Sequence, residues 1–437
     1  MPKFDRSAVN GAALCLCLLC VVSAGHAATE PLPDPLTLEH ALTLAAEADP
    51  RLQQVQADVD LARAGVMEAE ARDGVNVWIE GRARWIEPAD SSPDQSNDDH
   101  KLSLFARKSL YDFGRSNAQQ AAAAAELAGR EQLYLDGGQQ RRLEVMQRYF
   151  DVLRADLEFA RDDEAMAVAY VTLDRLRSRR ELGQVSDLDI LTMESEYQQS
   201  RQNRFASEAR MRVARAQLAI VLNRPGMLPA NLVRPELPQL ARVLPDYEML
   251  LNKALAENPR LLALRKRVEA AQQRLDGAYA GRRPRLSGEL EASNYSRDLG
   301  SNDKLRAGVY LEVPLYDGGT TNSAVARQQA ELYRSQAQLT EAERSLRQAV
   351  LEQWTELNNL RIERERTVVQ RNYRDLYLDR SRAAYEMEVQ ADLGDAMVRL
   401  SEAQLDEANV RFATALAWER MDALTGGPLP PAETAQQ

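Results

Sequence analysis

The chain has 437 residues, of which 44% are hydrophobic and 28% are charged. Its mean hydropathy of −0.47 excludes a polytopic helical membrane protein, because such a protein needs several apolar runs of about 20 residues. The net charge of −11 argues against a nucleic-acid partner, since phosphate contacts need a basic surface.

The first segment has the pattern of a secretory signal peptide. Lys3 and Arg6 precede an apolar stretch at 9–22, and small residues follow as far as Ala27. The stretch is too short to span a bilayer as a helix, so we predict a signal peptide over 1–27 that is removed near Ala27. All three cysteines lie inside it. We therefore expect neither a disulfide nor a Cys-ligated metal in the mature chain.

The remaining sequence holds no pattern of residues that points to catalysis. Only His40 and His100 remain as histidines, so no Ser/His/Asp, Cys/His or His-rich constellation can be assembled. The glycine spacings of nucleotide-binding loops are missing as well. We predict that the protein is not an enzyme and that it has no catalytic residue, cofactor or metal site.

The rest of the chain reads as two copies of one unit. Three segments of the first half recur in the second half: Asp49-Pro50-Arg51 as Asn258-Pro259-Arg260, Leu110-Tyr111-Asp112-Phe113-Gly114 as Leu315-Tyr316-Asp317-Gly318-Gly319, and Asp187-Leu188 as Asp392-Leu393. We predict a first repeat at 28–224, a Pro-rich linker at 225–245, a second repeat at 246–425 and a flexible tail at 426–437.

Each repeat contains two segments in which apolar and polar residues alternate, the period of a β-strand. We predict four strands, at about 77–87, 101–111, 285–295 and 304–315. Each is about as long as a tilted strand that crosses a bilayer. Periodicity alone also fits two amphipathic hairpins packed on a soluble core.

Long helices flank the strands. The sequence predicts helices over 36–74, 115–182 and 320–387, with breaks at 183–186 and 388–391 after which helices return. The second and third helices would each reach about 100 Å and form antiparallel coiled-coil hairpins. Four strands cannot close a barrel, and open strand edges are not tolerated in lipid. We therefore expect sister copies to complete the wall around a water-filled pore.

Three features together resemble the TolC family of outer-membrane factors: the duplicated halves, the strand-to-helix turns, and the tip of the first helical hairpin at Gly183 to Asp189. The turn residues are Tyr111, Asp112 and Gly114 in the first repeat and Tyr316, Asp317, Gly318 and Gly319 in the second. The resemblance implies a mainly α fold with a membrane β part: a homotrimer whose protomers give four strands each to a 12-stranded transmembrane β-barrel. The long helices would continue the barrel as a periplasmic tunnel below the outer membrane of a Gram-negative bacterium.

The resemblance also implies a function and partners. The protein would be the exit duct of a tripartite efflux or type I secretion system, joined by a periplasmic adaptor (membrane fusion protein) to an inner-membrane RND or ABC transporter. Its cargo would be small molecules (drugs, metals) or secreted proteins, and the sequence does not select between them. An alternative from another class is a periplasmic or surface coiled-coil scaffold or adhesin without a pore.

In the family, aspartates at the helical tips ring the periplasmic entrance. The matching candidates here are Gly183, Asp187 and Asp189 in the first repeat and Asp392 and Asp395 in the second. The second tip departs from the pattern, because Glu388 replaces the usual glycine and Gly394 replaces an aspartate. Helix N-capping is the competing role for these aspartates.

Overall fold

The computed structural model describes residues 33–47, 49–227, 230–297, 303–387 and 392–428. In chain order, the elements are α1 (Leu38–Glu47), α2 (Pro50–Asp73), β1 (Asn76–Trp85), β2 (Asp98–Tyr111), α3 (Arg115–Glu181), α4 (Asp187–Val221), η1 (Pro238–Ala241), α5 (Tyr247–Glu257), α6 (Pro259–Ala280), β3 (Arg285–Tyr295), β4 (Leu305–Glu312), α7 (Thr320–Glu386) and α8 (Leu393–Leu424). The predicted signal peptide, the tip at 388–391 and most of the predicted tail lie outside the described residues.

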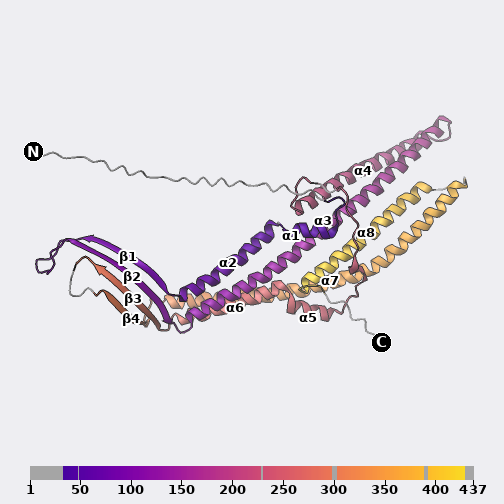
Figure 1. The fold of residues 1–437 in the computed structure, drawn as a ribbon. Helices are drawn as coiled ribbons and strands as arrows, with labels where there is room; N and C mark the ends of the chain where they lie inside the picture. Colours follow the sequence, from indigo (N-terminus) through magenta and orange to yellow (C-terminus); the bar gives the residue numbers. More distant parts are fainter. Residues whose placement is uncertain (1–32, 48, 228–229, 298–302, 388–391, 429–437) are drawn as a thin grey trace, which may run out of the picture.

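The molecule is a long rod, with the strands at one end and the tips of two helical hairpins at the other (Figure 1). Each half has the same order of elements: a short helix, a longer helix, two strands, a helix of 67 residues and a returning helix. The predicted mainly helical, duplicated fold is confirmed.

The prediction of one helix over 36–74 is wrong. The structure has two helices, because Asp49 begins a new one: its Oδ1 accepts the backbone N–H groups of Arg51 (2.6 Å) and Leu52 (3.1 Å). Pro50 follows at the first helical position, where its missing N–H costs nothing. In the second repeat Asn258 ends α5 and caps α6 in the same way, with Pro259 next. The Leu/Ala pattern runs through both junctions and hides them.

The two 67-residue helices begin at matching left-handed turns. Gly114 and Gly319 are the N-caps of α3 and α7, with φ of 93° and 88°. The residue before each is also left-handed: Phe113 has φ 56° and Gly318 has φ 65°. A residue other than glycine rarely adopts this conformation, so the left-handed Phe113 is unusual. Two consecutive left-handed residues occur at the same offset in both repeats, which supports the duplication.

The strands form one antiparallel sheet in the order β1-β2-β3-β4. The prediction of a strand over 304–315 is too long, because pairing ends at Glu312, two residues before Pro314, which has no N–H to give to a ladder. The first strand likewise ends at Trp85 rather than at 87, and β2 begins three residues before the predicted 101.

The helices lie side by side in a single layer. Near the sheet their order is α2, α3, α6, α7, and toward the tips it is α4, α3, α8, α7. Among the described residues, α7 makes no extensive contact with α2 or α4. The layer is therefore open, with α7 at one edge and α2 and α4 at the other.

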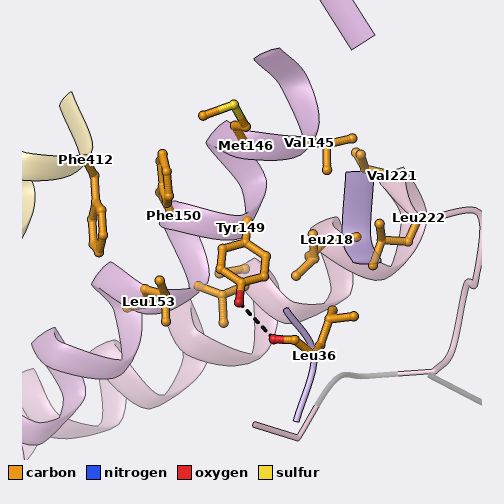
Figure 2. Close-up of a cluster of buried hydrophobic side chains, with 14 of the residues drawn as sticks. Leu36, Val145, Met146, Tyr149, Phe150, Leu153, Leu218, Val221, Leu222 and Phe412 are labelled. Atoms are coloured by element: carbon orange, nitrogen blue, oxygen red, sulfur yellow. Dashed lines mark hydrogen bonds between the residues drawn. The ribbon is translucent and has the colours of Figure 1, made fainter. Parts of the chain in front are cut away.

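Two buried clusters hold the middle of the rod: the first consists mainly of first-repeat residues together with part of α8, and the second consists of second-repeat residues. In the first, Tyr149 of α3 is fully buried beside Phe150, whose ring stacks on Phe412 of α8 at 4.7 Å (Figure 2). The Tyr149 hydroxyl donates to the carbonyl oxygen of Leu36 (2.8 Å), just before α1. In the second cluster, the Trp354 indole N–H donates to the carbonyl oxygen of Pro245 (3.2 Å), just before α5. Tyr149 and Trp354 are 205 positions apart, the same offset as the two strand-to-helix turns.

The segment at 225–245, predicted as a linker, packs along the helices. Leu232 forms a β-bridge with Leu36, and the Tyr149 hydroxyl also donates to the carbonyl oxygen of Val233 (2.5 Å). Arg242 forms two hydrogen bonds with Asp422 of α8 (2.8 and 2.9 Å), and its guanidinium lies over the Trp418 ring. Prolines end the regular structure here, but side-chain contacts fix the path.

Candidate functional site

The sheet has one apolar and one polar face. Cross-strand register places the apolar members of all four strands on one side: Val77, Ile79, Leu102, Leu104, Leu290, Leu305, Val309 and Leu311. They are open to the surroundings, with exposed fractions such as 65% for Ile79 and 73% for Leu305. On the other face Ser103, Glu291 and Ser293 are only 1–8% exposed. Side chains crowd on the inside of a curved sheet, so the polar face is concave and the apolar face is convex.

The concave face carries a network of charges. Lys101 Nζ pairs with Glu291 Oε1 (2.6 Å) across β2 and β3, and Arg107 Nε donates to Glu289 Oε2 (2.7 Å). Across β3 and β4, Arg285 donates to Glu312 (2.6 Å). Charged side chains at this density need water around them. This face therefore suits an aqueous compartment, whereas the convex face suits a bilayer.

The predicted turn residues lie together where strands pass into helices. Asp112 Oδ2 accepts the backbone N–H of Ser116 (2.8 Å), and Asp317 accepts those of Gly319 (3.0 Å) and Thr321 (2.8 Å). Hydrogen bonds from Thr321 and Gly319 lower the pKa of the Asp317 carboxyl. Both aspartates thus satisfy free N–H groups at the start of a long helix. Tyr111 and Tyr316 are exposed at this boundary.

The first tip is a compact turn. Gly183 has φ 71°, which favours glycine, and Asp187 Oδ1 pairs with Arg180 Nε (2.8 Å). Asp189 and Ser186 form a reciprocal capping box: the Asp189 N–H donates to Ser186 Oγ, and the Ser186 N–H donates to the Asp189 carboxylate (3.0 Å). Hydrogen bonds from the hydroxyl and the N–H of Ser186 lower the pKa of Asp189. The capping role is therefore present in this structure.

The carboxylates of the second tip are arranged differently. Asp392 precedes α8 without a side-chain capping bond, and Asp395 Oδ1 lies 3.3 Å from Arg399 Nε. Gly394 lies against Val168 of α3, which is 13 residues before the end of that helix. This corresponds to about 20 Å of helix. The second tip is thus set back along the rod, and the two groups of aspartates are not brought together within one protomer.

The Gly394 contact leads to a prediction. A Cβ at Gly394 would stand 2.6 Å from Val168 Cγ1, so Gly394→Ala must push α8 off α3, at a cost of about 1–3 kcal/mol. The same change at Gly65 of α2 meets no described atom within 4 Å and should stabilise by about 0.5–1 kcal/mol through helix propensity. Thermal unfolding of both variants measures the difference. Equal shifts would contradict the close α3–α8 contact.

Tyr149 and Trp354 were not predicted, although the sequence contains a signal for them. Both are aromatic residues with a polar tip, and they are separated by the offset that relates the turns. A second unpredicted feature is the contact of Arg297, after β3, with the β1–β2 loop, where the Arg297 guanidinium donates to Ser92 Oγ (3.2 Å). No local pattern predicts that contact, because it joins two loops that are far apart in sequence.

Comparison with known proteins agrees with this architecture. A family model described as "Outer membrane efflux protein" matches residues 250–427. The chain is 27% identical to protein CyaE of Bordetella pertussis over 59% of this chain and 55% of that protein. It is 26% identical to outer membrane protein TolC of Vibrio cholerae over 64% of this chain and 65% of that protein. The chain thus spans between about half and two thirds of the length of these curated relatives.

A solved structure extends the similarity over nearly the whole chain. The outer membrane protein VceC of Vibrio cholerae has a TM-score of 0.74 at 18% identity, covering 90% of this chain and 96% of that one. The described helices include none that is both long and apolar enough to cross a membrane. The matched family model describes outer membrane proteins, and both Vibrio cholerae relatives are named as outer membrane proteins. Residues 250–427 therefore match the outer membrane efflux protein family, and most of the chain shares the fold of VceC.

Proposed function

We propose that the protein is the outer-membrane exit duct of a tripartite export system. The observation that carries this proposal is the four-stranded sheet, with an apolar convex face, a charged concave face and two open edges. Closed into a barrel, such a sheet presents hydrocarbon-compatible side chains to lipid and a hydrated wall to the lumen.

Closure needs further copies of the chain. The edges that must meet are β4 and α7 of one protomer and β1, α2 and α4 of the next, because these are the outermost elements of the sheet and the helical layer. Two copies would give eight strands, a size whose interior side chains fill, whereas three give 12 strands and leave room for water. A homotrimer therefore fits an exit duct.

The helical layer would continue the lumen through the periplasm to the tips. There we expect a periplasmic adaptor and, through it, an inner-membrane RND or ABC transporter. The cargo would be small molecules such as drugs or metals, or a secreted protein. The duct supplies a low-barrier aqueous path and performs no chemistry.

The test is purification of the mature protein, followed by recordings in planar bilayers. We expect a detergent-dependent trimer that resists heat and discrete conductance steps. A chain that dissolves without detergent, remains monomeric and leaves the bilayer silent would be the coiled-coil scaffold or adhesin instead.

We further propose that Gly183, Asp187, Asp189, Asp392 and Asp395 surround the periplasmic entrance, and we expect Asp189→Ala to raise single-channel conductance. The variant removes both a carboxylate and the α4 cap. Ser186→Ala removes the capping hydroxyl but keeps the charge, and Asp189→Asn removes the charge but keeps a capping oxygen. A gate controlled by charge predicts that Asp189→Asn changes conductance and that Ser186→Ala does not; the reverse result assigns Asp189 to capping alone.

The same carboxylate should give the entrance a pH dependence of known sign. The lowered pKa keeps Asp189 charged at neutral pH, and its capping contribution is lost as the pH falls below about 4 and through the lowered value. Conductance of the wild type should therefore rise in that acidic range, as it should when Asp189→Ala removes the carboxylate, and that of Asp189→Asn should change less.

A further inference from the structure

A pocket of about 710 Å³ lies where the sheet meets the helices, between the start of α3 and the end of α6. Its lining includes Phe113, Asn117, Gln273, Asp276, Arg282 and Arg283. The predicted turn residues adjoin it, but the proposed duct gives it no role.

The pocket continues the apolar convex face. Tyr111 pairs with Leu286, a residue of that face, after a bulge at Leu110. The Leu110 side chain stays on the same face, because a Cβ built on Gly288 would meet it at 3.4 Å. The ring of Tyr111 then meets the ring of Phe113 edge to face at 4.6 Å. An unbroken apolar path thus leads from the sheet to the pocket.

The pocket carries two guanidinium groups, and the groups that contact them among the described residues are neutral. Arg282 donates to Asn322 Oδ1 (2.7 Å) and lies over the Tyr279 ring, and Arg283 donates to the carbonyl oxygen of Phe113 (3.0 Å). Within the described residues, neither arginine is ion-paired with a carboxylate. Each guanidinium has five N–H donors, so several remain for a ligand.

Other charged side chains near the pocket offset the positive charge of Arg282 and Arg283 only in part. Asp276 lines it as well and accepts a hydrogen bond from Gln272 (3.1 Å). Lys108, paired with Gly288, adds an exposed cation on the convex face. Positive charge therefore exceeds negative charge at the helical end of the apolar face.

We propose that this pocket binds the phosphate group of an anionic phospholipid in the periplasmic leaflet of the outer membrane. The inference rests on the proposed function, which turns the convex face toward lipid. Arginine holds phosphate oxygens through paired N–H groups, and aromatic residues mark the water interface of membrane barrels. Leu110 and Tyr111 offer a surface for the acyl chains, which a free phosphate ion lacks.

The test compares two double variants of the purified protein in detergent, with retained lipid counted by native mass spectrometry. Arg282→Gln/Arg283→Gln should weaken phosphatidylglycerol binding about tenfold. Arg179→Gln/Arg180→Gln removes an adjacent arginine pair at the far end of α3 and should leave binding unchanged. Asp276→Asn should strengthen binding by removing the opposing charge.

Each probe has an outcome that decides the proposal. Equal retention of phosphatidylglycerol by the two double variants, or equal retention of phosphatidylcholine by the wild type, overturns an anionic headgroup site. Inorganic phosphate that binds as tightly as the lipid would show a free-ion site and overturn the lipid assignment. Wild-type conductance, recorded on the same sample, tests the channel separately, so failure of one proposal is distinguishable from failure of the other.

Discussion

Replacing Asp49 by asparagine should destabilise the protein by about 3 kcal/mol, because it leaves the largely buried Arg141 without its main counter-charge. Asp49 is 4% exposed, and its Oδ2 lies 2.7 Å from Arg141 Nε. Arg141 in turn donates to the carbonyl oxygen of Val221, at the end of α4. Glu144, 3.1 Å from Arg141 but more exposed, compensates only in part. Asparagine still caps α2, so the loss measures the charge rather than the cap.

In the second repeat, a neutral side chain hydrogen-bonds the carbonyl group at the end of the returning helix. Asn258 takes the place of Asp49, and its side-chain N–H donates to the carbonyl oxygen of Leu424 (3.0 Å), at the end of α8. Leu346, buried in the second cluster, stands 205 positions after Arg141. The repeats thus satisfy equivalent helix ends by different chemistry, which is why exchanging the capping residues should be harmful in both directions.

Two comparisons isolate the effect of Asp49→Asn in denaturant unfolding. Asp246→Asn makes the same change at an exposed cap, that of α5, and should shift stability by less than about 0.5 kcal/mol. Asn258→Asp should be costly, because it buries a carboxylate that would face the carbonyl oxygen of Leu424 instead of an arginine. If Asp49→Asn is as mild as Asp246→Asn, the ion pair is not the source of the stability.

The strands and long helices were predictable because their signals are local. Alternation sets the faces of a strand, and the absence of proline between 115 and 182 lets a helix continue. The exact ends depended on single residues, such as Pro314 after β4 and Asp49 before α2. The predicted ends were wrong where the apolar pattern continued past a residue that ends the element, such as Pro314, or that begins a new one, such as Asp49.

The arrangement of the candidate entrance could not be read from the sequence. Equal lengths of α3 and α7 suggest level tips, yet Gly394 packs beside Val168, so the second tip is set back. That offset comes from how two helices pack side by side, which no periodicity within either helix records. The pocket with Arg282 and Arg283 is similar, because it forms only when α3 and α6 meet.

Tyr149→Ala should cost about 3–5 kcal/mol, since it opens a cavity in the first buried cluster and removes the single hydroxyl proton that the carbonyl oxygens of Leu36 and Val233 share. Tyr149→Phe keeps the ring and removes only the hydroxyl, so about 1–3 kcal/mol should be lost. Trp354→Phe in the second repeat should cost less than Tyr149→Ala, because Trp354 is only partly buried. Melting of the three variants in one detergent gives the ranking.

The stability that the Tyr149 hydroxyl contributes should depend on pH in one direction only. Burial raises the pKa of Tyr149 from 10.0 to about 12, against the lowering effect of its hydrogen bond to Val233. The unfolded chain therefore loses this proton first as the pH rises, and the stability contributed by the neutral hydroxyl, complete below pH 10.0, is lost as the pH approaches 12. The wild type should lose its advantage over Tyr149→Phe in this alkaline range. A stability difference that stays constant from neutral pH to about pH 12 would mean that the Tyr149 hydroxyl is not buried as the structure places it, because an exposed hydroxyl would titrate alike in the folded and unfolded chains.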